Sequence, residues 1–195
     1  MSMLLAVLLA GPQLLQAQKI KIVSGNLKFL KGVDQFDLAY DYEGMAVGKF
    51  KNEEDYLNER QAKLNEKEPG TGDQWRESWF ADRDNRFHPK FEELLNKNLG
   101  NKANARQNND KAPYTILLKT VFTEPGFNVG VARRNASIDV EIHFIDKATG
   151  ETRAVMEMSK IPGRGGFDYD TGIRIMEAYA KCGKELGKYL VKKAL

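Results

Sequence analysis

The clearest pattern along the chain is an alternation of apolar and polar positions, which is typical of β-strands with one buried face. Apolar residues fill every second position from Ala136 to Phe144, and the turn sequence DKATG at 146–150 leads into a second run at 152–161. This arrangement predicts a β-hairpin in which Gly150, at the end of the turn, adopts a positive φ.

Further strands are predicted in both halves of the chain. A period of two at 36–42 indicates one strand, and an apolar run within 19–30 indicates another before it. β-branched and aromatic residues at 114–123 predict a third strand. The Asn-rich stretch at 101–113 has the composition of a loop.

Helical spacing of apolar residues replaces the strand pattern in two places. Between Asn52 and Leu99 it predicts three short helices, with EPGTG at 68–72 interrupting them and Pro89 in the first turn of the third. The segment 171–195 carries an apolar stripe that predicts one long C-terminal helix.

Two details of the C-terminal helix follow from residue type. Asp170 or Thr171 is expected to be its N-cap. Gly183 and Gly187 lie on the apolar stripe, which predicts a close approach to a sheet, whereas Arg174 falls on the charged face. Together the elements predict an α+β fold: a mainly antiparallel sheet with a helical insertion and a long C-terminal helix packed on one face.

The first 17 residues, MSMLLAVLLAGPQLLQA, contain no charged residue and are followed by Gln18. The apolar run is shorter than the about 20 residues of a membrane span, and small residues follow it, which predicts a signal peptide at 1–17. A buried N-terminal helix is the alternative. We therefore expect a single α+β domain at 18–195, exported and periplasmic, without a transmembrane span in the mature chain.

Composition excludes several classes of function. A net charge of +3 gives no indication of a nucleic-acid partner. The single cysteine, Cys182, and two histidines far apart in sequence provide no metal-ligand spacing, so neither a metal nor another cofactor is expected. Asp139, Glu141 and His143 share one strand face, where a solvated surface explains them more simply than catalysis does.

The glycine-rich segment PGRGGFDYDTG at 162–172 is interpreted as a hinge with a helix cap. Its glycines precede the helix too early for a phosphate loop, and Asp168 and Asp170 place negative charge at the helix entrance. A small-ligand-binding or hydrolase site beside this hinge is the alternative to a non-enzymatic function.

Two segments are candidate interaction sites. The first combines Trp75 and Trp79 with Arg83 and Arg86, residue types that are enriched in interface hot spots, although core packing also explains tryptophans one turn apart. The second is the loop TEPGFNVGVARRN at 123–135, which carries Phe127, Arg133 and Arg134.

The stretches YTILLKTVFTEPG and ASIDVEIHFIDKATGETRAVMEMS, a glycine-rich hinge and a Lys/Ala-rich helix form the C-terminal half. This half resembles bacterial envelope accessory lipoprotein domains, namely transporter auxiliary lipoproteins and curli-secretion-like N-terminal domains. The whole chain, with YDYEGMAVGKF and WFADRDNRFHPKFEELLNKNL, resembles an uncharacterised exported protein family of Bacteroides-type bacteria. The resemblance implies an envelope accessory or interaction protein with an envelope protein partner. The chain lacks the lipid-anchoring cysteine of the lipoproteins.

Overall fold

The computed structural model describes residues 19–130, 132–163 and 169–195. The predicted signal peptide at 1–17 and residues 164–168 of the glycine-rich hinge lie outside the described residues. Within the described residues, no helix is both long and apolar enough to cross a membrane.

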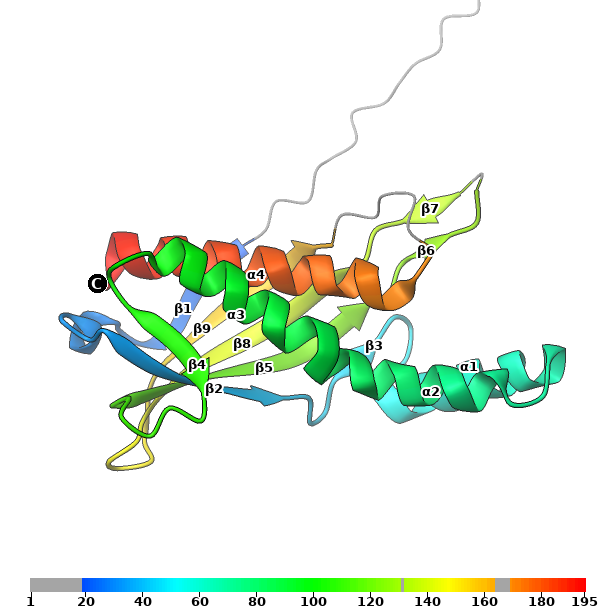
Figure 1. The fold of residues 1–195 in the computed structure, drawn as a ribbon, viewed down its shortest axis with the longest axis horizontal. Coiled ribbons are helices and arrows are strands. Elements are labelled where there is room, and N and C mark those ends of the chain that lie inside the picture. Colours follow the sequence, from blue (N-terminus) through cyan, green and yellow to red (C-terminus); the bar gives the residue numbers. More distant parts are fainter. Residues whose placement is uncertain (1–18, 131, 164–168) are drawn as a thin grey trace, which may run out of the picture.

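A mostly antiparallel sheet forms one layer of the molecule (Figure 1). Its strand order is β1 (Lys19–Gly25), β9 (Thr152–Pro162), β8 (Ser137–Asp146), β5 (Tyr114–Glu124), β2 (Gln35–Asp41) and β4 (Asn104–Gln107). The neighbouring strands β1, β9, β8 and β5 are antiparallel to one another. β2 pairs in parallel with β5 and with β4, and β3 (Ala46–Val47) runs parallel to the end of β5. The predicted hairpin is confirmed as β8–β9, with Gly150 at φ +75° in its turn.

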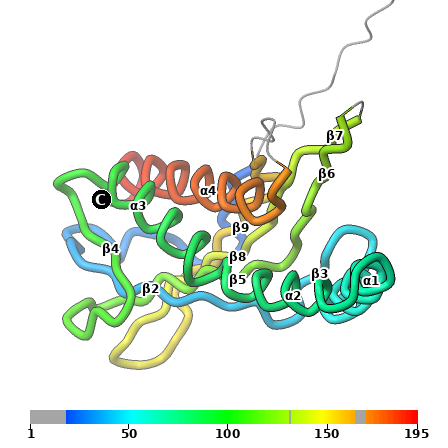
Figure 2. The backbone as a smooth tube through the Cα atoms, turned by 45° about the vertical axis from the view of Figure 1, so that its right-hand side comes forward, coloured from blue at the N-terminus to red at the C-terminus, as the bar shows by residue number. Residues whose placement is uncertain are grey.

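The longer helical elements are α1 (Glu53–Lys67), α2 (Thr71–Asp82), the π-helical segment η2 (Arg83–Phe87), α3 (His88–Leu99) and α4 (Thr171–Lys193). In Figures 1 and 2, α3 and α4 lie side by side across one face of the sheet, while α1 and α2 extend beyond the sheet. We call α1 and α2 the helical arm. The α+β fold with its helical insertion and long C-terminal helix is thus confirmed.

Three local expectations were wrong. Residues 101–113 are not all loop, because the Asn96 side chain binds both backbone groups of Ala105, at 2.7 and 2.8 Å, and holds β4 beside β2. Leu27–Leu30 does not extend the first strand but leads into the short 3-10 helix η1 (Lys28–Leu30). The loop at 123–135 contains a small hairpin, β6 (Phe127–Asn128) and β7 (Arg133–Arg134).

The hydrophobic core lies between the sheet and the α3–α4 layer. Its fully buried members come from the inner face of each central strand and from both helices: Phe36, Ile116, Leu118, Val140, Ile142, Phe144, Met156, Met158, Phe91, Leu95, Tyr179, Leu186 and Leu190. Charged residues occupy the other sheet face, where Lys119 lies opposite Asp41 and Glu141. The sheet therefore buries one face and exposes the other.

Gly183 and Gly187 approach a helix and not the sheet, contrary to the prediction. A Cβ on Gly183 would lie 2.3 Å from the carbonyl oxygen of Phe91, and one on Gly187 would lie 2.8 Å from that of Leu95. The absence of side chains at these two positions thus allows the backbone of α4 to lie directly against the backbone of α3.

We expect Gly183→Ala to lower the free energy of unfolding by about 1–3 kcal/mol, because the new methyl group overlaps the α3 backbone. Alanine is the better helix former, so propensity alone predicts the opposite sign. Urea denaturation measures the difference, with Lys188→Ala on the exposed side of α4 as the control. Equal or greater stability of Gly183→Ala would contradict the close contact.

Candidate functional site

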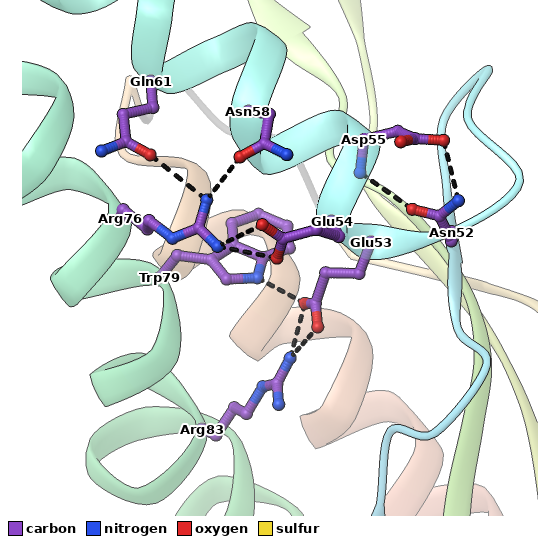
Figure 3. Close-up of polar contacts among 9 residues, drawn as sticks. All are labelled: Asn52, Glu53, Glu54, Asp55, Asn58, Gln61, Arg76, Trp79 and Arg83. Carbon is purple, nitrogen blue, oxygen red and sulfur yellow. Dashed lines mark hydrogen bonds and ion pairs between the residues drawn. The ribbon is translucent and has the colours of Figure 1, made fainter.

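Two members of the predicted tryptophan–arginine patch, Trp79 and Arg83, lie where α2 continues into η2, at the base of the helical arm (Figure 3). Trp79 is only 7% exposed, and its indole Nε1 donates a hydrogen bond to Glu53 Oε1 at 2.6 Å. Arg83 Nη2 donates to the other oxygen of the same carboxylate, also at 2.6 Å. Because Glu53 begins α1, these bonds fasten α1 to α2 and η2.

The other members of the patch are also engaged within the molecule. The ring of Trp75 lies 5.7 Å from that of Trp79 and 5.8 Å from that of Tyr56. Arg86 Nη1 lies 2.8 Å from a carboxylate oxygen of Asp170, at the start of α4. Core packing therefore accounts for Trp79, and a binding role for Trp75, Trp79, Arg83 and Arg86 stays a prediction.

Phe80 is the large hydrophobic side chain that the arm exposes, at 40%. The guanidinium groups of Arg76 and Arg83 lie 5.9 and 5.0 Å from the centre of its ring. Arg76 is itself held by Glu54, with both carboxylate oxygens 2.7 Å from Nη2 (Figure 3). Next to the patch, the arm thus exposes one aromatic ring that two ion-paired arginines contact.

A buried cluster of aromatic rings surrounds His88, the first residue of α3. The imidazole stacks on Tyr40 at 3.7 Å between ring centres, and its Nε2 lies 3.0 Å from the hydroxyl of Tyr42. Burial lowers the pKa of His88, and the charge of Arg83 acts in the same direction, although the Asp84 carboxylate opposes both. His88 is therefore held in its neutral form at neutral pH.

This lowered pKa makes the stability of the protein depend on pH. The unfolded chain takes up a proton at His88 below its ordinary pKa of about 6.5, while the folded protein resists it. We expect the free energy of unfolding to fall as the pH decreases from about 7 to about 5.5, more steeply in wild type than in His88→Gln. Urea denaturation at each pH measures the two slopes. Identical slopes would show that His88 does not contribute.

The remaining candidate residues show no catalytic arrangement among the described residues. Cys182 is fully buried, and burial raises the pKa of its thiol well above the ordinary value. Glu141 and His143 contact each other at 3.1 Å on the open sheet face, and Asp139 accepts a hydrogen bond from the Lys160 backbone at 2.6 Å. No group of three described His, Cys, Asp or Glu residues is placed to hold a metal ion.

A pocket of about 400 Å³ lies where the arm, the end of β5 and the beginning of α4 meet. Three segments far apart in the sequence form it: Gly48–Lys63 in part, Glu124–Val129, and Tyr169–Arg174 in part. It therefore brings together Phe127, from the second candidate segment, and residues flanking the predicted hinge. Arg133 and Arg134 lie beside it, since Arg134 pairs with Phe127 and Arg133 with Asn128 in the β6–β7 hairpin.

Arg174 packs against this hairpin. The sequence placed it on the charged face of the C-terminal helix, and that prediction was wrong. The Arg174 side chain is buried, with 3% exposure, and Nη2 donates to Thr171 Oγ1 at 2.9 Å. The guanidinium also reaches the carbonyl oxygens of Pro125 and Gly126, at 3.4 and 3.5 Å. Because these two residues form the turn into β6, Arg174 connects α4 to the hairpin.

The N-cap of α4 fixes the third wall of the pocket. Asp170 is confirmed as the cap, because its side chain accepts hydrogen bonds from the backbone of Gly172 and Ile173 at 2.7 and 3.3 Å. The bonds to these amides and to Arg86 lower the pKa of Asp170, although its partial burial acts in the opposite direction. The beginning of α4 is thereby joined to η2 at the base of the arm.

Three pocket residues on the side of the arm, Lys49, Arg60 and Lys63, were not predicted from the sequence. Val129 and Tyr169 lie within the segments 123–135 and 162–172 that the sequence indicated, but were not singled out. The spacing of Arg60 and Lys63 does place them on one side of a helix. However, nothing in the sequence indicates that this side faces residues 124–129, because the pairing depends on where the arm leaves the sheet.

Arg174→Ala is expected to lower the free energy of unfolding by about 2 kcal/mol, since it removes charge-assisted hydrogen bonds from buried carbonyl groups. Arg133→Ala, a change of the same residue type at an exposed position of β7, serves as the control and should change stability by less than about 0.5 kcal/mol. Denaturant titration of both variants measures the effects. Similar values for the two would contradict the anchoring role of Arg174.

No protein-family model matches the chain, and no curated protein matches it. Among solved structures, the PelC dodecamer from Paraburkholderia phytofirmans is similar, with 11% identity and a TM-score of 0.41 over 89% of this chain and 97% of that one. A single-residue variant of the same PelC aligns with 13% identity and a TM-score of 0.37, over 84% of this chain and 97% of that one. Values this low carry no information on function.

Proposed function

We propose that this protein is a non-enzymatic accessory or interaction protein of the bacterial envelope, which binds another envelope component through the surface around the pocket. We call this surface the hairpin surface and define it by five residues: Phe127, Val129, Arg133, Arg134 and Tyr169. The export pattern at 1–17 and the resemblance of the sequence to exported envelope families support the location.

One observation carries the proposed binding role. Five large hydrophobic side chains are exposed among the described residues, and three of them, Phe127, Val129 and Tyr169, line the same pocket, with exposures of 42, 65 and 71%. Exposed apolar side chains that gather around a concavity and are flanked by arginines are typical of protein contact sites. The two-stranded hairpin that carries Phe127 projects beyond the sheet, where a partner can reach it (Figures 1 and 2).

A small-ligand-binding protein or hydrolase is the second candidate, because the pocket lies beside the predicted hinge and has the volume of a ligand site. Hydrolysis by a nucleophile needs a base within hydrogen-bond reach. Neither a cysteine nor a histidine is among the described residues that line the pocket, and its two carboxylates, Glu59 and Glu124, are held in ion pairs with lysines and with Arg134. This composition favours binding over hydrolysis.

Site-specific photo-crosslinking in the native host tests the proposed function. With a photoreactive amino acid at Val129, we expect a recurrent covalent adduct with one envelope component. The same amino acid at Thr149, in the exposed β8–β9 turn at the far end of the sheet, should give no such adduct (Figure 1). Mass spectrometry identifies the adducts. Equal labelling from both positions, or none from Val129, would contradict the hairpin surface as the contact site.

A further inference from the structure

The pocket is a trough between two backbone segments that separate after running side by side. Gly48 still bonds to β5, through its amide to the Thr123 carbonyl oxygen at 2.9 Å. The chain then turns back, with Phe50 N bonded to Val47 O at 2.9 Å, while β5 continues through Pro125 into β6. A space therefore opens between residues 48–50 and 124–129, which both line the pocket.

The strand that borders this space has an unused edge. β6 pairs with β7 on one side only, in a separate two-stranded sheet. No other described strand pairs with Phe127 or Asn128. An edge of this kind offers backbone donors and acceptors to an extended chain, which is how many domains bind peptides.

The arm wall of the pocket has an excess of positive charge. Lys49, Arg60 and Lys63 all line it, and the Glu59 carboxylate is shared by the two lysines, with Lys49 Nζ at 3.4 Å. The side chains of Lys49 and Lys63 remain 73 and 60% exposed. Among the described residues, no carboxylate forms an ion pair with Arg60.

The remaining carboxylate in the pocket does not offset this excess. Glu124 lines the opposite wall and is engaged by Arg134, whose Nη1 lies 3.2 Å from Oε2. Apolar contact area is available beside the cations, from Phe50 and Tyr56 on the arm side and from Phe127 across the trough. The trough thus combines a free strand edge, a cationic wall and aromatic rings.

From this combination we infer that the pocket binds an extended, acidic segment of the partner protein. The segment lies as an added strand along β6, with its carboxylates toward Lys49, Arg60 and Lys63 and an apolar side chain against Phe127. This inference rests on the proposed function and names the chemistry of the partner at the same site. Main-chain hydrogen bonds provide affinity, and the charged wall selects the acidic segment.

Selection of random linear peptides on the purified full-length protein tests the inference. The enriched peptides are expected to carry a net negative charge and an apolar residue. Arg60→Glu/Lys63→Glu should weaken binding of the best of them about tenfold, which corresponds to about 1.4 kcal/mol. The matched control, Lys188→Glu/Lys192→Glu, makes the same charge change towards the C-terminal end of α4, whereas the pocket is at its N-terminal end. It should leave the affinity for the peptide unchanged.

The backbone contribution is tested on the same peptide. Proline at alternate positions removes the amides that a strand needs, so it should abolish binding, whereas alanine at those positions that are neither acidic nor apolar should not. Basic or neutral selected peptides, or equal affinity for the pocket and control variants, would overturn the inference. Full binding of the proline-substituted peptide would overturn the added strand.

Failure of the inference is distinguishable from failure of the proposed function. A chain that crosslinks an envelope protein at Val129 in cells, yet selects no acidic peptides, retains its interaction role and loses only the acidic-segment assignment. Adducts of Val129 with a second copy of this chain would overturn both proposals. Crosslinking to a non-protein component would overturn the acidic-segment assignment alone.

Discussion

The contact between α3 and α4 sets the geometry of the whole molecule. Because Gly183 and Gly187 carry no side chain, two helical backbones lie against each other, and the pair forms one compact layer over the sheet. The direction of α4 is then determined by α3, and the first turn of α4 is brought to the base of the arm. There Asp170 meets Arg86. The hairpin, the arm and the helix entrance thus come together as a consequence of packing elsewhere.

A buried pair of hydroxyl groups also joins α4 to the sheet. Tyr179, on α4, is buried, and its hydroxyl lies 2.7 Å from that of Thr120 on β5. Its ring stacks on Phe87 of η2 at 5.0 Å. Burial raises the pKa of Tyr179 to about 12, so the phenol stays protonated and can act as a donor within the core. A satisfied hydroxyl pair of this kind fixes orientation more strictly than an apolar contact does, because hydrogen bonds depend on angle.

The sequence predicts those elements whose pattern is local and repeated. Alternation along β8 and β9 and the apolar stripe of α4 give the strands, the helix and the fold class. Contacts between distant residues are harder to predict. The strand β4 depends on the side chain of Asn96, which no local pattern indicates. Arg174 has the spacing of a surface residue on its helix, yet it is buried because Pro125 and Gly126 pack against it. The glycines on α4 indicated a close neighbour, but the prediction assigned it to the sheet, whereas it is α3. The exposure of Phe127 was predictable from its loop, whereas the cationic wall beside it was not, because Lys49, Arg60 and Lys63 come from the turn before α1 and from α1 itself, far away in the sequence.

The π-helical segment has a consequence for how the arm is oriented. In η2 the His88 amide bonds to the carbonyl of Arg83, five residues earlier, so α2, η2 and α3 form one uninterrupted rod that contains a widened turn. Each residue of a helix rotates the following side chains by about 100°. The extra residue in the widened turn therefore rotates the side chains of α3 relative to those of α2 about the helix axis. As a result, one face of the rod contacts α1 and a different face contacts α4. Loss or gain of a single residue at this turn is a simple evolutionary route to re-aim the arm about the rod axis while both flanking helices keep their own sequences.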